Sequence, residues 1–433
     1  MKLTIIGGGP GGYTAAFAAA KAGVEVTLVE RAHLGGTCLH TGCIPTKTLR
    51  SSADALDTVA RLREFGIAGD CAATPDMSAI VARKRKVTAT LQTGLEKTAA
   101  QLKVRVVRGD AEFVGAGLVR VASVDGSLEI AGDRVILATG SSPLELPSLP
   151  VDHRLVLSSD DALELQTVPE HLVVVGGGVI GCELAFIYRA FGAKVTVIEG
   201  QGRLLPLPSV DGEISRLLLR EMKKKGIAVE LARTVTATTP TGTGVSVEIG
   251  ASPFVEVANP PAPRTLEADA VCVTVGRVPH TDGLGLDAAG VKVDARGWIE
   301  ADDFLETSVP GVYAIGDVIG PRRIMLAHMA VAEAHTAVHN ILHPEDRKAQ
   351  RYDVVPSAIF TAPEIGDVGL SEAQAKQQGF AVKTSVFQFR ELGKAQAMGE
   401  LAGLFKLVVE EGSGKLLGAH IAGAHETVLD LVC

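Results

Sequence analysis

The hydrophobic and polar positions of the chain repeat one plan twice. In Lys2 to Glu30, and again in His171 to Glu199, an apolar run leads into a glycine turn, an alanine-rich segment, a short loop and a second apolar run that ends in an acid. Short apolar runs bounded by glycine are typical of buried strands, and the alanine-rich segments favour helix. The pattern therefore predicts two separate units of strand, turn, helix and strand.

The glycines and the final acid keep the same spacing in both units. The corresponding residues are Gly7, Gly9, Gly12 and Glu30 in the first unit and Gly176, Gly178, Gly181 and Glu199 in the second. Each pair is separated by 169 positions, which is the interval from Gly7 to Gly176. In a dinucleotide fold the first glycine makes the turn, the second lets the backbone approach the pyrophosphate and the third lets helix pack on strand. Two dinucleotide sites are predicted.

The acid after the second strand of the repeat selects the nucleotide. A carboxylate such as Glu199 accepts hydrogen bonds from ribose hydroxyls but repels a 2′-phosphate. The second unit is therefore predicted to bind NAD rather than NADP. Arg203 lies nearby in the sequence and is the feature that would instead suit a 2′-phosphate.

The segments outside the repeat predict further elements. Ala53 to Lys103 is charged and alanine-rich, which indicates long helices. Val104 to Val121 and Ser127 to Leu137 alternate apolar and polar residues around glycines, which indicates an antiparallel ribbon. After Gln350 the composition changes, and the pattern predicts short strands around a helix at Ser371 to Gln378. This last part is expected to be a third, mixed domain.

Composition and charge exclude several classes of protein. The chain has 433 residues, of which 46% are hydrophobic and 21% charged, a balance that suits several globular domains. The net charge of -8 and the absence of a long Lys/Arg run argue against a nucleic-acid binder. Charged residues interrupt every apolar stretch before it reaches the ~18 residues of a membrane span. We expect a cytoplasmic protein.

Only two of the six cysteines are closely spaced. Cys38 and Cys43 follow directly on the first repeat unit, in the segment from Gly35 to Lys47. A thiolate at a helix N-terminus or beside a cation has a lowered pKa, which dithiol exchange requires. Neither a second cysteine pair nor a histidine cluster completes a zinc site, so no metal is predicted. A redox dithiol is the interpretation, with two inert cysteines as the alternative.

The motifs together resemble those of the class I flavin- and pyridine-nucleotide-dependent disulfide oxidoreductases, and within them the dihydrolipoamide dehydrogenases. The likeness covers nearly the whole chain. It rests on the first glycine motif, the Gly-Gly-Thr-Cys-x4-Cys-Ile-Pro-x-Lys box, Ala138-Thr139-Gly140, the second glycine motif extended to Glu183, Gly276-Arg277-x-Pro279, Ala314-Ile315-Gly316-Asp317, Leu326-Ala327-His328, and Pro363-Glu364 with Val368-Gly369-Leu370-Ser371-Glu372.

The resemblance implies an α/β fold with two Rossmann-like domains and a C-terminal α+β interface domain, here truncated. The FAD-binding domain would comprise residues 1–147 and 273–348, the NAD-binding domain 148–272 and the interface domain 349–433. It also implies a homodimer that transfers electrons from dihydrolipoamide through the Cys38–Cys43 disulfide and FAD to NAD+. Components of 2-oxo acid dehydrogenase or glycine cleavage complexes are possible partners.

The resemblance also assigns roles to individual residues. Cys43 would be the thiolate beside the flavin, Cys38 the sulfur that exchanges with substrate, and Lys47 would lie near flavin N5, paired with Glu183. Asp317 would hold the ribityl chain, Ala327 would offer its amide to the flavin, and Ala111 would contact the adenine part. The remaining residues expected to bind FAD or NAD are Gly7, Gly9, Gly12, Glu30, Gly36, Thr37, Thr139, Gly140, Arg277 and Leu326, and Gly176, Gly178, Val179, Ile180, Gly181, Glu199 and Gly276.

The sequence departs from the family pattern near its C-terminus. The family's acid–base histidine lies in a His-Pro-Thr segment, which these 433 residues do not contain; His425 is followed by Glu426 and takes no such role. Either the sequence stops short of the segment, or the enzyme lacks the base. An enzyme without it is expected to keep NADH-to-dye transfer while dihydrolipoamide turnover falls about 10²- to 10⁴-fold. Cys433, at the C-terminus, stands alone rather than in the vicinal pair of mercuric reductases.

Two smaller departures and three alternative functions stay open. His280 replaces the usual Asn, and Arg322-Arg323 lengthens the loop before Leu326, where a solvated loop is the plainer interpretation. The alternatives are a reductase of another disulfide or of a metal ion, a diaphorase without the C-terminal histidine, and a redox-responsive flavoprotein that binds a partner without turnover.

Overall fold

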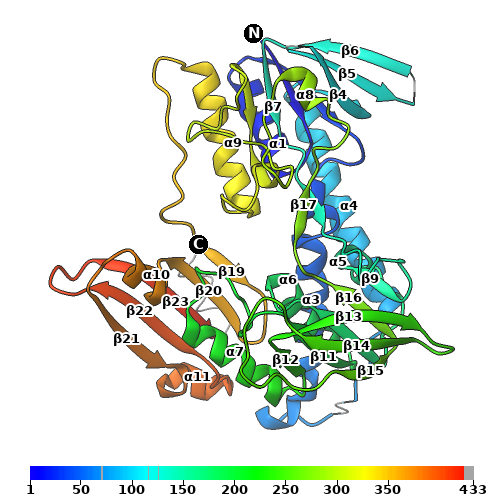
Figure 1. Cartoon of the computed structure of the whole chain (residues 1–433), viewed down its shortest axis with the longest axis vertical. Helices are drawn as coiled ribbons and strands as arrows, with labels where there is room; N and C mark the ends of the chain where they lie inside the picture. Colours follow the sequence, from blue (N-terminus) through cyan, green and yellow to red (C-terminus); the bar gives the residue numbers. More distant parts are fainter. Residues whose placement is uncertain (70–71, 116, 125, 424–433) are drawn as a thin grey trace. The chain divides into compact units, whose positions relative to one another are not determined.

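The computed structural model describes residues 1–69, 72–115, 117–124 and 126–423 (Figure 1). The chain divides into two compact units, each assembled from three segments. Unit 1 comprises Met1–Pro45, Arg83–Pro143 and Gly276–Tyr352, and unit 2 comprises Thr46–Ala82, Leu144–Val275 and Asp353–Cys433. Two long helices, α3 (Cys43–Ala60) and α4 (Met77–Gln101), run from one unit into the other. The long helices expected between Ala53 and Lys103 are thus present.

Unit 1 is built on a five-stranded parallel sheet in the order β18-β7-β1-β2-β3. Its strands are β1 (Lys2–Ile6), β2 (Glu25–Glu30), β3 (Arg105–Arg108), β7 (Arg134–Leu137) and β18 (Val312–Ala314). Helices α1 (Pro10–Lys21) and α9 (Ala327–Leu342) pack against each other. Buried aliphatic side chains of the sheet and of α1 form the core of this unit.

The antiparallel ribbon expected from Val104 to Leu137 is only partly correct. Its centre forms a three-stranded antiparallel sheet of β4 (Asp110–Gly115), β5 (Leu118–Ser123) and β6 (Gly126–Ala131). Its two ends, β3 and β7, instead join the parallel sheet on either side of the β1–β2 pair. Apolar and polar alternation cannot distinguish these outcomes, because a strand's partner depends on contacts far away in the sequence. A second short ribbon pairs β8 (Ser141–Pro143) with β17 (Arg277–Pro279).

Unit 2 contains a second five-stranded parallel sheet in the order β12-β11-β10-β16-β9. Its strands are β9 (Val156–Ser158), β10 (His171–Val175), β11 (Lys194–Glu199), β12 (Ala228–Leu231) and β16 (Ala270–Val273). Every residue of β10 is buried, which explains its unbroken apolar pattern. Helices α5 (Ser159–Ala162), α6 (Val179–Ala190) and α7 (Gly212–Lys224) and the antiparallel strands β13 (Arg233–Pro240), β14 (Val245–Ala251) and β15 (Arg264–Ala268) complete this part.

The C-terminal part of unit 2 is an antiparallel sheet in the order β19-β20-β23-β22-β21. Its strands are β19 (Ser357–Ile359), β20 (Glu364–Gly369), β21 (Val382–Gln388), β22 (Leu404–Glu410) and β23 (Leu416–Gly423), with the short helices α10 (Glu372–Gln377) and α11 (Gly393–Met398). Ser371 caps α10, and Gln374 returns a bond to the Ser371 amide. This capping box confirms the helix predicted at Ser371 to Gln378.

Candidate functional site

The first glycine turn lies between β1 and α1. Gly7 has φ +104, and a Cβ there would come within 2.2 Å of the Ala138 carbonyl oxygen. A Cβ on Gly12 would come within 1.8 Å of the Gly7 carbonyl oxygen, so this close approach of helix and strand requires glycine. Within the described ranges, no side chain caps the N-terminus of α1 at Gly9. The free amides and the helix dipole at this end suit a pyrophosphate.

The Glu30 carboxylate is hydrogen-bonded to the backbone at this turn. Its Oε2 accepts a hydrogen bond of 2.7 Å from the Gly8 amide, and its Oε1 accepts one of 2.7 Å from the Ala32 amide. The carboxylate at the end of β2 is therefore held at the glycine turn, where the sequence motif places a ribose.

The second glycine turn, between β10 and α6, has the same geometry. Gly176 also has φ +104, and a Cβ on Gly181 would come within 2.0 Å of the Gly176 carbonyl oxygen. Glu199 accepts hydrogen bonds from the amides of Gly177 (2.5 Å) and Gln201 (2.6 Å). Gly178 precedes α6 without a side-chain cap, and no described atom would lie within 4 Å of a Cβ there. Both turns thus have the backbone that a dinucleotide needs, and the second also has open space beside Gly178.

Arg203 is engaged elsewhere. Its guanidinium donates to the carbonyl oxygens of Val210 (3.0 Å) and Leu207 (2.6 Å). Burial lowers the pKa of this side chain, and Asp211 opposes that effect. These contacts commit the arginine to its own loop, which favours the NAD preference expected from Glu199. Val179 and Ile180 form the first turn of α6, and Ile180 is exposed.

The dithiol segment lies against the first glycine turn. Cys38 lies in α2 (Gly36–His40), and Cys43 begins α3; both are half-buried. The Gly35 amide donates to the Gly8 carbonyl (2.8 Å), and a Cβ on Gly36 would come within 2.7 Å of the Gly9 Cα. Glycine at position 36 therefore permits a close backbone approach that places Thr37 and the cysteines directly beside the predicted pyrophosphate site.

Tyr13 is a neighbour of the dithiol that sequence reasoning missed. It lies in the first turns of α1, and its pKa is raised by burial and by the nearby Cys38 and Cys43. The available signal was a single phenol in an otherwise Gly- and Ala-rich helix start. By contrast, Cys182 and Cys272 are fully buried, and burial raises the pKa of the Cys272 thiol to about 12 and that of Cys182 still higher. Those two thiols stay protonated and inert.

The predicted ion pair between Lys47 and Glu183 is not present among the described residues. Lys47 is exposed, and its Nζ lies 3.9 Å from the centre of the Phe360 ring. Glu183 is 9% exposed and accepts a 2.9 Å hydrogen bond from the Phe360 amide. Burial raises the pKa of Glu183, while the Phe360 amide, Lys47 and Arg50 lower it. The two side chains therefore contact the same residue, Phe360, rather than each other.

Asp317 lies in a polar cluster at the β8–β17 ribbon. Ser141 Oγ donates to Asp317 Oδ2 (2.6 Å), and Arg277 Nε donates to Ser141 Oγ (2.6 Å). Arg277 Nε also lies 3.8 Å from the Asp317 carboxylate. Gly276 precedes this ribbon with φ +142, and the motif residues Arg277 and Asp317 are therefore brought together in unit 1.

His280 forms hydrogen bonds with the Ala138-Thr139-Gly140 motif. Its Nδ1 donates to the Thr139 carbonyl (2.9 Å), Thr139 Oγ1 donates to the His280 carbonyl (2.7 Å), and the His280 amide donates to the Gly140 carbonyl (3.0 Å). Burial lowers the pKa of His280, and Arg31 and Arg277 lower it further. The neutral ring accepts from Arg31 through Nε2 at 3.3 Å. This histidine thus takes a structural place that the sequence left without a role.

The other predicted cofactor residues lie at element ends. Ala327 begins α9 and Leu326 is its N-cap residue, while Ala111 lies in β4 with 9% of its surface exposed. His425, Glu426 and Cys433 lie outside the described residues. Arg323 pairs with Asp303 at 2.9 Å.

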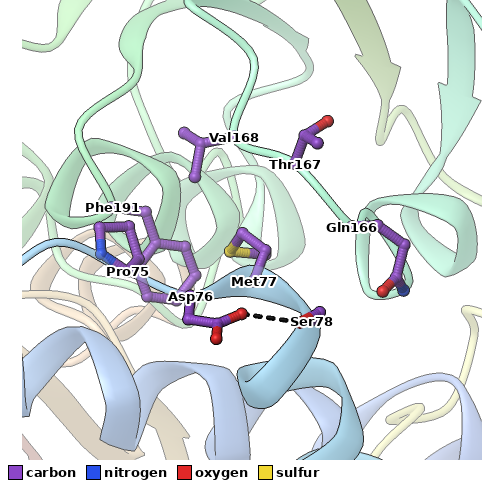
Figure 2. Close-up of a pocket in the computed structure, with 8 residues that line it drawn as sticks. All are labelled: Pro75, Asp76, Met77, Ser78, Gln166, Thr167, Val168 and Phe191. Atoms are coloured by element: carbon purple, nitrogen blue, oxygen red, sulfur yellow. Dashed lines mark hydrogen bonds between the residues drawn. The ribbon is translucent and has the colours of Figure 1, made fainter.

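A shallow pocket of about 480 Å³ in unit 2 is not the predicted site (Figure 2). It is lined by Pro75, Asp76, Met77, Ser78, Gln166, Thr167, Val168 and Phe191, and none of the predicted site residues is among them. Its one carboxylate is already engaged, because Asp76 accepts from the Ala79 amide (3.0 Å) and from Ser78 Oγ (2.8 Å) at the start of α4.

No described helix is long and apolar enough to cross a bilayer.

Comparisons with known families agree with the motifs. Residues 1–334 match the family model of pyridine nucleotide-disulphide oxidoreductases, and residues 355–430 match the model of that family's dimerisation domain. The interface domain predicted to be truncated is therefore present, and its family supports a homodimer.

Several relatives and solved structures are similar over nearly the whole chain. Dihydrolipoyl dehydrogenase from Chlorobaculum tepidum is 39% identical over 99% of this chain and 88% of its own length, and that from Geobacillus stearothermophilus is 39% identical over 98% and 86%. The structure of LpdA from Mycobacterium tuberculosis has a TM-score of 0.89 at 27% identity, covering 100% of this chain and 92% of that one. The HOCl-induced flavoprotein disulfide reductase RclA from Escherichia coli has a TM-score of 0.85 at 28% identity, covering 100% and 92%.

These matches confirm the family and the two cofactors that the motifs indicated. The two uncapped glycine turns fit two dinucleotides, and the dithiol segment lies against the first of them. The chain belongs to the pyridine nucleotide-disulphide oxidoreductase family and is an oxidoreductase that uses FAD and NAD(H).

Proposed function

We propose that this enzyme oxidises dihydrolipoamide and delivers the electrons to NAD+ through Cys38, Cys43 and FAD. The observation that supports it most is the packing of the dithiol segment on the first glycine turn, through the Gly35–Gly8 hydrogen bond and the contact of Gly36 with Gly9. A dithiol at this place is next to the dinucleotide that the turn would hold. The dihydrolipoyl dehydrogenases among the relatives indicate the substrate.

The exchange steps balance with the two cysteines alone. One substrate thiolate attacks Cys38 Sγ, so that a bond forms between substrate sulfur and Cys38 while the Cys38–Cys43 bond breaks and Cys43 leaves as a thiolate. The second substrate thiolate then attacks the first substrate sulfur, the cyclic disulfide forms, and Cys38 leaves as a thiolate. The two protons of the substrate thiols are released to water as the thiolates form. When bound, FAD would supply the two-electron chemistry that links the Cys38–Cys43 dithiol to NAD+.

The positions of the side chains support distinct roles. Cys43 begins α3, and the dipole at a helix N-terminus stabilises a negative sulfur. Lys47 follows one turn later on the same helix and adds a positive charge near that end. Glu183, buried and bonded to the Phe360 amide, would position the segment on which Lys47 rests. We assign Cys43 to the flavin side and Cys38 to the substrate side.

The cofactor contacts that we propose are those that the motifs and the family resemblance assign. On the FAD side, Glu30 would bind the ribose, Asp317 the ribityl chain and Ala327 the flavin edge. On the NAD side, Glu199 would bind the ribose while Arg203 remains tied to Leu207 and Val210. Lipoyl-bearing components of 2-oxo acid dehydrogenase or glycine cleavage complexes are the proposed partners of the homodimer.

The decisive experiment compares C38S and C43S in the FAD-loaded protein. Both variants should lower dihydrolipoamide-dependent NAD+ reduction by about 10³-fold or more, because each lacks one sulfur of the exchange. C38S should show a long-wavelength thiolate-to-flavin absorbance band without added reductant, and C43S should not. C272A is the matched control, since Cys272 is buried and protonated, and it should keep full activity.

The outcome also separates the competing functions. If C43S retained disulfide-linked activity, the proposed route would be wrong. If the unchanged protein reduced other disulfides with NADH but did not oxidise dihydrolipoamide, the likeness to a flavoprotein disulfide reductase such as RclA would be the better guide to its substrate.

A further inference from the structure

Glu333 is a buried carboxylate that no motif singled out. It lies on α9 with 1% of its surface exposed. Its Oε2 accepts a 2.6 Å hydrogen bond from the Gly316 amide, and its Oε1 accepts a 2.8 Å hydrogen bond from the Tyr352 hydroxyl. A buried carboxylate is costly unless it is hydrogen-bonded, and here both of its oxygens accept hydrogen bonds.

The hydrogen bond to Gly316 connects Glu333 to the Asp317 turn. Gly316 has φ +73 and begins the short 3-10 helix Gly316–Ile319, in which Asp317 is the next residue. On the other side of that turn, Asp317 accepts from Ser141 and faces Arg277. Glu333 also shares α9 with Ala327, the first residue of that helix. It therefore ties together the two elements that carry the proposed FAD ligands.

The charged groups around Glu333 are few. Asp317 repels its ionised form, and Arg323, which lies over the Tyr352 ring at 4.9 Å, attracts it. α1 packs along α9, and its sequence has a single charged residue, Lys21, in its last turn. Burial is the largest influence and raises the pKa of Glu333 to about 7, while the Gly316 amide and the Tyr352 hydroxyl lower it. The side chain therefore changes charge in the neutral range.

We propose that Glu333 is a positioning residue for FAD, which orients the Gly316–Asp317 turn and controls the charge beside it. The inference rests on the proposed contacts of Asp317 and Ala327 with FAD. The pyrophosphate of FAD is negative at all pH values considered, so binding is favoured when Glu333 is neutral. Glu333 ionises as the pH rises through 7, and the affinity for FAD should fall over the same range.

The test is a fluorescence titration of the FAD-free protein with FAD from pH 6 to pH 8. The unchanged protein should bind FAD about three- to tenfold more weakly at pH 8 than at pH 6, a coupling of ordinary size. E333Q keeps an acceptor for Gly316 and a partner for Tyr352, so it should fold and bind at every pH as the unchanged protein does at pH 6. E333L, which has no acceptor, should bind more weakly throughout.

Two further variants make the test specific. Y352F removes a donor that stabilises the ionised carboxylate, so the pH at which affinity falls should move upward. D367N is the matched control: Asp367 in unit 2 is 3% exposed, and burial also raises its pKa to about 7, but it lies outside the FAD-binding unit. It should leave the pH dependence of FAD binding unchanged.

The results distinguish this inference from the proposed function. If E333Q kept the pH dependence of the unchanged protein, or if E333L bound FAD equally well, the role of Glu333 would be refuted while the FAD site stood. If the unchanged protein did not bind FAD at all, the proposed function itself would fail.

Discussion

At the scale of single residues, burial sets the charge of Asp367. This aspartate lies on β20, and the only hydrogen bond among its pKa determinants is the 3.2 Å one from Ser357 Oγ to its Oδ1. Burial raises its pKa to about 7, and Ser357 only partly opposes this. Between pH ~4, near the pKa of an unfolded aspartate, and pH 7, the folded protein binds more protons at this site than the unfolded chain. Stability therefore falls as the pH rises through this range.

We expect D367N to remove this loss. Asparagine carries no proton that must be released, so the variant should be more stable than the unchanged protein at pH 8 by roughly 2–4 kcal/mol, and the difference should vanish towards pH 4. Urea unfolding of both proteins at several pH values measures it. A D367N protein that gained nothing in relative stability between pH 5 and pH 8 would contradict the assigned cause.

At the scale of elements, the two glycines at the start of α6 have different tasks: one is needed for packing of the fold, and the other leaves room for a ligand. Gly181 is required for packing, because a Cβ there would come within 2.0 Å of the Gly176 carbonyl oxygen. Gly178 has φ -74, and a Cβ there would have no described atom within 4 Å, so the protein itself tolerates alanine at this position. No described protein atom fills the space beside Gly178, and we predict that the pyrophosphate of NAD occupies it.

The variants G178A and G181A should therefore differ. G178A should keep the stability of the unchanged protein and bind NADH at least about tenfold more weakly, because its methyl group would occupy the approach of the pyrophosphate. G181A should lower the midpoint of thermal unfolding, since backbone atoms must move. NADH titration and calorimetry measure the two effects. Equal NADH affinity in G178A and the unchanged protein would argue against the second site.

The elements also show which features a sequence pattern predicts and which it does not. The repeat of strand, turn and helix is local, and both copies form as predicted. The partner of each strand is not local: β3 and β7 join the parallel sheet of unit 1 although they continue the alternating pattern of the antiparallel ribbon. Pattern identifies a strand, whereas packing of distant segments selects its neighbour.

At the scale of the whole molecule, one buried lysine joins parts of unit 2 that are far apart in the chain. Lys406 on β22 is 1% exposed, and its Nζ lies 3.0 Å from Asp211, 3.3 Å from Glu213 and 2.6 Å from Glu372. Burial alone would raise the pKa of Asp211, but the Glu213 amide and Lys406 lower it. The start of α7 and the start of α10 are thereby tied to the antiparallel sheet.

K406M should destabilise the protein by about 3–5 kcal/mol at pH 7, because it leaves the buried Asp211 and two half-buried carboxylates without their cation. The pKa values of Asp211 and Glu372 are lowered in the folded state, so their contribution is present above pH ~4 and is lost as the pH falls through those lowered values. K376M is the matched control: it removes only the exposed Lys376–Glu372 pair, worth less than ~1 kcal/mol. Urea unfolding compares them, and equal losses in both variants would refute the role of burial.

The sequence by itself determined the features whose physics is local. The two glycine turns, the acids that close them and the dithiol segment each lie within about thirty residues, and backbone geometry there depends on which residues are glycine. The family followed from these motifs. The family resemblance also implied Lys47 and Glu183 as partners, but nothing in the sequence indicated that both contact Phe360.

Only the tertiary structure decided which distant groups meet. Phe360 and Glu183 are 177 positions apart, and Lys406 and Asp211 are 195 apart. Glu333 reaches Gly316 only because α9 packs beside that turn. Burial and pairing of such groups depend on how elements from separate segments pack, and that packing sets the charge of Glu333, Asp367 and Asp211 in ways that no local pattern encodes.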